Sequence, residues 1–275
     1  MTTPTVSVVI PAYNNARTLA ETIDSVLAQS GADFEVIIAD HSSADTTRAV
    51  MDTFADDPRV TILTTEAGGG AGRNWNRVTD AARGTYLKLV CGDDLLLPGV
   101  LARQADILRG GAVLTACRRN VVDSSGNVLI KDWGLRGVTA AMPGARAVRA
   151  AVRAGSNPFG EPASVMMHRD ALERSGGWFD EYPYLIDQAS YSRVLLTGDF
   201  VPDLETGAAF RMSDTQWSVA LSASQSAQAR GFHQWLRDAH PEVVSDLDVR
   251  AGNIRAALMS RARRLSYALL KRRMR

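Results

Sequence analysis

The sequence has little cysteine and lacks any long apolar run. Only Cys91 and Cys117 occur among 275 residues, and their spacing matches no metal or redox motif. We therefore expect structural thiols in a reducing compartment. No apolar segment approaches the length that spans a bilayer, and no signal peptide is visible, so we expect a cytoplasmic protein. Internal repeats and low-complexity segments are also missing, whereas 45% hydrophobic residues suffice for a sizeable core.

Charge is nearly balanced overall but unevenly distributed. The formal net charge is +1, yet residues 255–275 hold eight basic residues and no acidic one, against 23 basic and 30 acidic residues elsewhere. In this tail a narrow helical stripe is formed by Leu258, Ala262, Leu265 and Leu269. Such a basic amphipathic helix favours contact with an anionic membrane surface, the alternative being a helix docked on its own domain. Few aromatic residues are interleaved, so a nucleic acid partner is not expected.

The first hundred residues alternate between strand and helix patterns. Apolar strands are predicted at residues 6–10, 35–39, 60–64 and 86–90, and the first breaks into a turn at Pro11. Helical patterns lie between them, and Thr18 and Glu21 have the spacing of a capping box. This alternation predicts an α/β fold with a doubly wound, mainly parallel sheet flanked by helices.

The last of these strands runs into the adjacent carboxylates Asp93 and Asp94. Open α/β sheets bind ligands at the carboxyl ends of their strands. Two neighbouring carboxylates repel each other and need a cation or donors, which indicates a site for a metal and an anion. The alternative is that one of them caps the helix that Pro98 helps to start.

Five segments together resemble the family 2 inverting glycosyltransferases, which have the GT-A fold. They are residues 7–14 (SVVIPAYN), 40–45 (DHSSAD), 72–76 (GRNWN), 92–95 (GDDL) and 176–181 (GGWFDE), followed by Asp187. The resemblance covers about residues 5–215. It implies a nucleotide-sugar-binding half at 1–110 and an acceptor-binding half at 111–215. Residues 216–275 would then form a C-terminal helical extension that ends in the basic tail.

The resemblance also implies roles in donor binding. Asp94 would bind Mg²⁺ or Mn²⁺ directly, and Asp93 would hold the ribose or a metal-bound water. Tyr13 would stack on the nucleobase, and the nucleotide sugar would also meet Pro11, Asn14, Asp40 and His41. Arg73 follows a glycine loop at a predicted helix start, where it could meet phosphate or base.

The acceptor half contains the candidate catalytic base. Asp187 opens a helical pattern, and the helix N-terminus would lower its pKa and stabilise the anion. The resemblance implies that it takes the proton from an acceptor hydroxyl, the alternative being a plain N-cap. Glu161, Trp178 and Asp180 are the acceptor-binding candidates. Trp178 could instead pack in the core. Glu161 could lie on the loop surface, and Asp180 could shape its loop.

Two departures from the family pattern bear on substrate choice. His41 stands where many relatives have an aspartate that accepts a hydrogen bond from uracil, and Arg211-Met212-Ser213 replaces an Arg-x-His. We thus expect a transferase acting on a glycan or lipid-linked acceptor in cell-surface polysaccharide or glycolipid synthesis. The rival classes are a sugar-phosphate nucleotidyltransferase, which would carry a basic glycine loop after the first strand, and a non-catalytic nucleotide-sugar-binding scaffold.

Overall fold

The computed structural model describes residues 4–212 and 224–273, as backbone only beyond residue 260. The strands are β1 Val6–Ala12, β2 Phe34–Asp40, β3 Val60–Thr64, β4 Tyr86–Leu89, β5 Leu95–Leu96, β6 Ala112–Val122, β7 Val128–Trp133, β8 Met142–Pro143, β9 Val165–His168 and β10 Asp199–Arg211. They join in one sheet in the order β3-β2-β1-β4-β9-β6-β10-β5, with β7 beside β6 and β8 beside β10. Strands of both halves of the chain therefore share a single sheet.

The mainly parallel sheet confirms the predicted fold class. Strands β3, β2, β1 and β4 are parallel, as are β6 and β10. Strand β9 runs antiparallel between β4 and β6, which the alternation of the first hundred residues did not indicate. The first strand also continues through Pro11 to Ala12, although the sequence predicted a break at the proline. Pro11 is buried in register with Ala39, so it belongs to the strand end.

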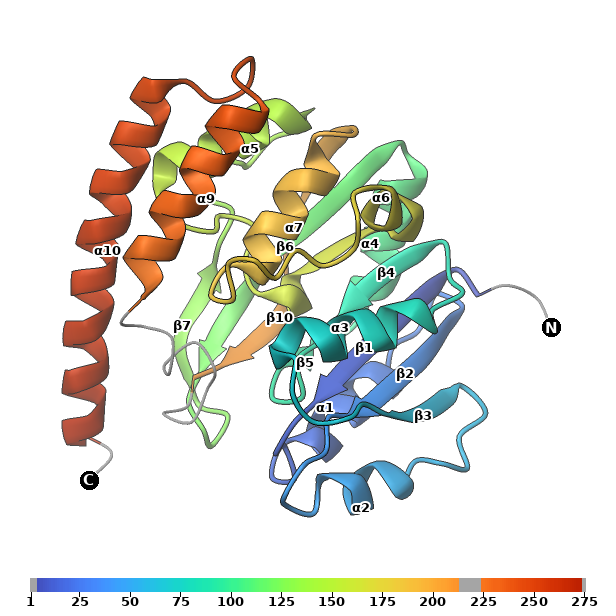
Figure 1. Cartoon of the computed structure of the whole chain (residues 1–275). Helices are drawn as coiled ribbons and strands as arrows, with labels where there is room; N and C mark the ends of the chain where they lie inside the picture. The colour runs from blue at the N-terminus through green and yellow to red at the C-terminus, as the bar shows by residue number, and fades with distance from the viewer. Residues whose placement is uncertain (1–3, 213–223, 274–275) are drawn as a thin grey trace.

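Helices cover both faces of the sheet (Figure 1). They are α1 Leu19–Leu27, α2 Thr47–Asp52, α3 Gly70–Asp80, α4 Val100–Arg109, α5 Gly144–Ala154, α6 Arg169–Arg174, α7 Ile186–Leu195, α9 Gln225–Ala239 and α10 Asp246–Arg273, with a 3₁₀ turn at Pro162–Ser164. Val8 and Ile10 of β1 pack into the core that includes α1 and α4, whereas Val9 packs into the core that includes α3, α5 and α7. This alternation arises because successive side chains of a strand point to opposite faces.

A buried asparagine joins the strand ends at which the candidate site lies. Asn74 of α3 donates through Nδ2 to the carbonyl oxygens of Ala12 (3.3 Å) and Ala39 (3.1 Å), and accepts a 2.6 Å hydrogen bond from the Thr65 hydroxyl. These contacts hold α3 against the carboxyl ends of β1 and β2. Asn74 thus fixes the edge of the sheet through buried hydrogen bonds, which strengthen where water is excluded.

The capping box predicted for the first helix does not form. Thr18 is the N-cap residue of α1, but its hydroxyl donates to the Gly92 carbonyl oxygen at 2.8 Å instead of capping the helix. Glu21 pairs with Arg211 of β10. Both polar side chains are therefore used in long-range contacts, Thr18 with the segment that carries Asp93 and Glu21 with β10, which local spacing could not reveal.

The C-terminal helices pack at one end of the sheet, where α9 and α10 lie side by side (Figure 1). Helix α10 also approaches α5 closely. A Cβ added to Gly252 would collide with the Val152 carbonyl oxygen. Asp248 of α10 pairs with Arg149 of α5 at 2.9 Å. Leu258 is the described member of the tail stripe and is 57% exposed. Its neighbours Ala262, Leu265 and Leu269 have side chains outside the described residues. Among the described helices, none is both long and apolar enough to cross a bilayer.

The position of Asn74 predicts a loss of stability in Asn74→Ala. The variant removes the Asn74 amide from two buried carbonyl oxygens and one hydroxyl, although the Ala12 oxygen keeps the His41 amide, and a buried polar group left without a partner costs about 1–3 kcal/mol. We expect the free energy of unfolding to fall by about 2–4 kcal/mol, measured by urea denaturation. Asp80→Ala, at an exposed position on the same helix, is the control and should change it by less than about 0.5 kcal/mol. Equal stability of the two variants would contradict the assigned role of Asn74.

Candidate active site at the carboxyl edge of the sheet

The candidate metal carboxylates lie in a tight turn between β4 and β5. The Asp94 amide donates to the Cys91 carbonyl oxygen at 3.0 Å, and the Asp94 side chain is only 1% exposed. The next helix, α4, begins at Val100 with Gly99 as its N-cap residue. Neither aspartate is therefore a helix cap, and the capping alternative is excluded.

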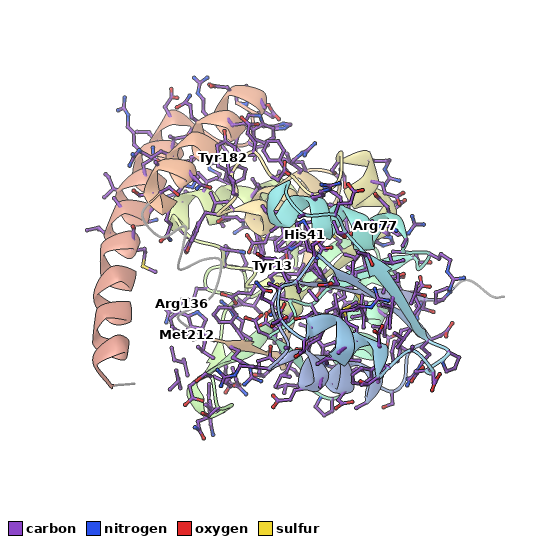
Figure 2. All side chains as sticks on the ribbon, turned by 60° about the horizontal axis from the view of Figure 1, so that its bottom comes forward. Tyr13, His41, Arg77, Arg136, Tyr182 and Met212 are labelled. Atoms are coloured by element: carbon purple, nitrogen blue, oxygen red, sulfur yellow. The ribbon has the colours of Figure 1, made fainter. Side chains whose placement is uncertain are left out.

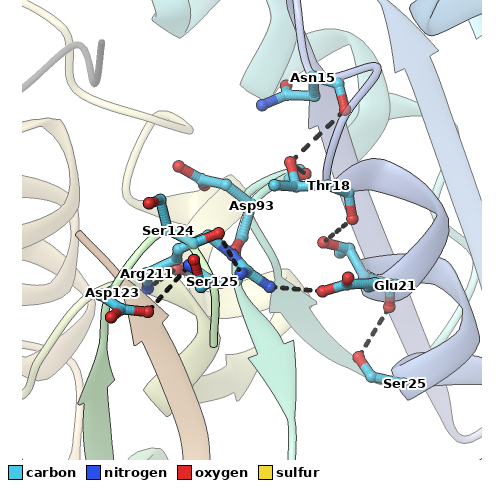
Figure 3. A network of polar contacts seen from close by, with 12 residues as sticks. Asn15, Thr18, Glu21, Ser25, Asp93, Asp123, Ser124, Ser125 and Arg211 are labelled. Atoms are coloured by element: carbon cyan, nitrogen blue, oxygen red, sulfur yellow. Dashed lines mark hydrogen bonds and ion pairs between the residues drawn. The ribbon is translucent and has the colours of Figure 1, made fainter. Parts of the chain in front are cut away.

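Arg211, at the end of β10, fixes this turn through hydrogen bonds (Figure 3). Its amide donates to Asp94 Oδ1 at 3.1 Å, and its Nε donates to the Asp93 carbonyl oxygen at 3.0 Å. The rest of the guanidinium donates to the Ser124 carbonyl oxygen at 3.2 Å and pairs with Glu21 at 2.6 Å. One buried arginine thus joins β10, α1 and the loop after β6 to the aspartate turn. Sequence reasoning noted Arg211 only for the histidine missing after it. Ser213, at that histidine's position, lies outside the described residues.

The surroundings of Asp94 suit a bound cation. Burial, and secondly the negative charge of Asp93, raise the pKa of the Asp94 carboxyl well above its usual range. A divalent ion would offset both effects, since its charge favours the ionised carboxylate. No group of three or more histidine, cysteine or acidic side chains in the described part of the chain could hold a metal alone. The residues present thus fit Mg²⁺ or Mn²⁺ bound by one or two carboxylates, with phosphate and water as the remaining ligands.

Tyr13 and His41 lie together where β1 and β2 end, as Figure 2 shows. Tyr13 is 58% exposed, and its ring centroid is 6.0 Å from that of His41, at an interplanar angle of 61°. His41 is 8% exposed, and its Nε2 is 2.9 Å from the Gly68 carbonyl oxygen of the glycine loop. The first pair of strand ends therefore presents an exposed aromatic ring beside an imidazole.

Asn14 and Asp40 connect the loops that follow these strands. The Asn14 amide donates to the Ser43 hydroxyl, and Asn14 Oδ1 accepts from the Ala44 amide, both at 2.9 Å. Asp40 Oδ1 accepts from the Ser43 amide at 3.1 Å. These contacts give both side chains a part in shaping the loops around Tyr13 and His41.

Arg73 lies in the first turn of α3, which begins in the glycine loop as the sequence indicated. Its guanidinium pairs with the exposed Glu66 at 2.8 Å and donates to the Ala67 carbonyl oxygen at 3.1 Å. The arginine is therefore folded back on its own loop. An exposed pair of this kind contributes little to stability, so Arg73 can exchange Glu66 for a phosphate at small cost.

Asp187 lies in the first turn of α7, two residues after its N-cap Leu185, and no side-chain hydrogen bond caps this helix. Asn157 donates to Asp187 Oδ2 at 2.9 Å. Burial raises the pKa of Asp187 to about 6, although hydrogen bonds from the Gln188 amide and Asn157 act in the opposite direction. The helix N-terminus was expected to lower this pKa. The expectation was wrong because desolvation outweighs the local donors.

The remaining acceptor candidates differ in their surroundings. Glu161 pairs with the buried Arg119, whose Nη2 donates to Oε1 at 3.0 Å. Trp178 is 3% exposed and its indole donates to the Thr79 hydroxyl at 2.8 Å. This burial corrects the acceptor-binding expectation for Trp178 in favour of its core alternative, because no face is left for a sugar. Asp180 packs against Gly72 in the first turn of α3, where a Cβ would collide with its carboxylate.

Two side chains, the half-buried Cys91 and the buried Tyr191, lie near the candidate carboxylates. The pKa of the Cys91 thiol is raised well above its usual range by burial, and then by the charges of Asp94, Asp93, Asp187 and Glu161. Tyr191, one helical turn after Asp187, is fully buried, and its hydroxyl has no hydrogen-bond partner among the described residues. The carboxylates of Asp93, Asp94, Asp187 and Glu161 therefore all lie close enough to Cys91 to affect its pKa. Sequence reasoning missed Arg119, Asn157 and Tyr191. Only Tyr191 carried a signal, its i+4 spacing from Asp187.

Comparison with known proteins places this arrangement in a family. The model of glycosyl transferase family 2 matches residues 7–176, so the chain belongs to that family. An uncharacterised protein of Mycobacterium tuberculosis is 31% identical over 208 residues, and the succinoglycan biosynthesis protein ExoO of Rhizobium meliloti is 35% identical over 127 residues. These alignments cover 72% and 46% of the present chain. The chain spans 65% of the first relative and 36% of ExoO, less than two thirds of each.

Solved structures agree on the fold. The mannosyltransferase PcManGT of Pyrobaculum calidifontis, in complex with GDP-Man and Mn²⁺, superposes with a TM-score of 0.63 at 17% identity. The match covers 97% of the present chain and 80% of PcManGT. The expected GT-A fold is therefore confirmed.

Proposed function

We propose that the chain transfers a sugar from a nucleoside diphosphate donor to a hydroxyl of a glycan or lipid-linked acceptor, with inversion at the anomeric carbon. One observation supports the proposal: besides burial, the charges of Asp93, Asp94 and Asp187 all raise the pKa of the Cys91 thiol, so these carboxylates lie near one another, with Asp94 buried. A nucleotide-binding scaffold needs the aspartate pair but has no use for Asp187. Residues 1–110 would bind the donor, and residues 111–215 the acceptor.

The donor would lie along the carboxyl ends of β1, β2 and β4. Tyr13 would stack on the base, while Pro11, Asn14 and Asp40 shape the surrounding loops. Asp93 would hold the ribose, and Arg73 would turn from Glu66 toward the diphosphate. Asp94, with Asp93, would hold Mg²⁺ or Mn²⁺, which as a Lewis acid would neutralise the leaving diphosphate. PcManGT, whose complex contains a nucleotide sugar and Mn²⁺, supports this choice of ligand and ion.

Asp187 would act as the general base. Asn157 fixes one carboxylate oxygen at 2.9 Å, which leaves the other to accept the proton of the attacking hydroxyl. A pKa of about 6 suits this role, because the group is ionised at neutral pH yet is a stronger base than an exposed aspartate. Glu161 and Asp180 would position the acceptor sugar. Attack from the side of Asp187, in line with the leaving diphosphate, would invert the configuration.

ExoO, named for succinoglycan biosynthesis, favours a role in polysaccharide synthesis. A lipid-linked acceptor would bring the protein to the cytoplasmic face of a membrane. The basic tail is suited to that surface, since its eight positive charges attract anionic lipid headgroups. Leu258 on α10 is exposed, so this face of the helix would be free to contact a membrane.

Asp94→Asn tests the metal assignment. The variant keeps an oxygen that can accept from the Arg211 amide but removes the charge that would bind the cation. In calorimetric titrations of a nucleoside diphosphate, we expect Mn²⁺ to strengthen binding by about tenfold or more in the wild type, and to have little effect in the variant. Asp80→Asn, an exposed matched change, should behave as the wild type. Binding that is equally strong with and without Mn²⁺ in all three proteins would refute the assignment.

Asp187→Asn tests the base. The change preserves size but cannot accept a proton, so we expect kcat to fall by about 10²-fold or more, with unchanged nucleotide affinity. Wild-type kcat should also fall as the pH drops through about 6, where the Asp187 carboxylate becomes protonated, and the variant should lose this limb. Asp80→Asn, at an exposed position outside the proposed site, is the matched control. Near-normal turnover in Asp187→Asn would move the base to Asp180 or Glu181.

Truncation after Ser260 tests the membrane role of the tail. It removes seven of the eight basic residues and keeps Gly252 and Asn253, at which α10 contacts α5 and α9. Each charge near an anionic surface contributes about 1 kcal/mol, reduced by salt, so the full chain should co-sediment with anionic vesicles at low salt only. The truncated chain should remain in solution. Identical sedimentation of both proteins would indicate a docked structural helix.

A further inference from the structure

Lys88 is a buried lysine that the proposed chemistry does not use. It lies in β4, the strand that leads to Asp93, and its side chain is 0% exposed. Its Nζ donates to Gln104 Oε1 at 2.7 Å and to the Val165 carbonyl oxygen at 3.3 Å. Burial lowers the pKa of the ammonium group to about 8, so Lys88 is mostly charged at neutral pH. A buried charge is costly unless it is paired, so the partners of Lys88 indicate what it holds in place.

Gln104 of α4 extends this contact to the neighbouring carbonyl oxygen. It is also 0% exposed, and its Nε2 donates to the Ser164 carbonyl oxygen at 2.8 Å. A lysine can only donate, so Gln104 must turn its oxygen to Lys88 and its nitrogen to Ser164. The two side chains together hold the carbonyl oxygens of Ser164 and Val165, and they join α4 and β4 to the start of β9.

Lys88 lies where the backbone pairing between β4 and β9 ends. The register of these strands comprises Tyr86 with His168 and Leu87 with Met167. Lys88 follows the last of these pairs in the direction of the aspartate turn. Its side chain therefore continues the connection between the two strands beyond their backbone hydrogen bonds.

The segment held in this way is the one that carries Glu161. Glu161 is the N-cap residue of the 3₁₀ turn Pro162–Ser164, and its carbonyl oxygen accepts from the Ser164 amide at 2.9 Å. At the other end of the segment, Asn157 donates to Asp187 at 2.9 Å. The segment therefore runs from the candidate base to the strand of the candidate metal carboxylates.

We propose that Lys88 is a positioning residue for the acceptor: together with Gln104 it sets the place of Glu161 relative to the aspartate turn. The inference rests on the proposed function, in which Glu161 positions the acceptor sugar. Transfer needs the attacking hydroxyl and the anomeric carbon in close register, and a displacement of about 1 Å can cost about 10²-fold in rate. A lysine with a purely structural role would affect the stability of the fold alone.

Lys88→Met tests this role, because methionine has a similar length but cannot donate. The first measurement is hydrogen exchange of the Ser164 amide, which reports on the turn without any ligand. We expect exchange to become about tenfold faster or more, the scale of one lost hydrogen bond from a charged group. Gln104→Leu removes the other donor and should have the same effect, so it serves as an independent variant should Lys88→Met not fold.

The second measurement separates the two halves of the site. Calorimetry with UDP and GDP in the presence of Mn²⁺ should give affinities within about twofold of the wild type for both variants. In transfer to p-nitrophenyl glucoside, galactoside and mannoside, the apparent KM for the glycoside should rise by about tenfold. Leu236→Ala, a buried change in α9 that destabilises the fold away from this segment, is the control and should keep wild-type values.

Three outcomes would contradict the proposals. An unchanged exchange rate at Ser164, or an unchanged KM, in the two variants would overturn the inference and leave the proposed function standing. Equal changes in Leu236→Ala would also overturn it, since they would reflect stability alone. If the wild type transfers sugar from no donor to any of the glycosides, the proposed function fails and the acceptor role of Lys88 fails with it, whatever the exchange rate.

Discussion

The burial of Asp94 beside Asp93 is the constraint around which the site is built. A carboxylate that is 1% exposed cannot rely on water, so its charge must be balanced by protein donors or by a cation. The Arg211 amide donates to Asp94 and the charge of Arg119 also favours its ionised form, yet burial and the charge of Asp93 still raise the pKa of Asp94 well above its usual range. At the nearby ends of β1 and β2, by contrast, the buried side chain of Asn74 is fully hydrogen-bonded to protein groups. The imbalance at Asp94 is thus a local feature that a metal with a diphosphate would resolve.

Arg211 links the turn that carries Asp93 and Asp94 to distant elements of the fold. It stands at the end of β10, more than a hundred residues after the aspartates, yet it fixes their turn and pairs with Glu21 of α1. The same strand lies parallel to β6, which carries Arg119, the partner of Glu161. The aspartate turn and Glu161 are therefore both held by arginines of two neighbouring strands in the same sheet.

The sequence alone was enough to predict the structural features that depend on residues close together in the chain. Strand burial at Val6–Ala12, the aspartate turn after β4 and the helical position of Asp187 follow from apolar patterning and turn chemistry over a few residues. Features that depend on distant partners could not be derived in this way. Thr18 and Glu21 have perfect capping spacing but bind Gly92 and Arg211 instead. Trp178 could be assigned to the core, and the raised pKa of Asp187 recognised, only once the packing around α7 was known.

We propose that one edge of the sheet both binds a nucleotide sugar and cleaves it. The most direct measurement is product release from a panel of nucleotide sugars with different bases, incubated with the full chain and Mn²⁺, with and without a generic glycan acceptor. The account predicts release of the nucleoside diphosphate from at least one donor, with inverted configuration in the sugar product. Contradiction would come from the absence of diphosphate release across the panel. It would also come from formation of a nucleoside triphosphate when pyrophosphate is added, the reaction of a nucleotidyltransferase.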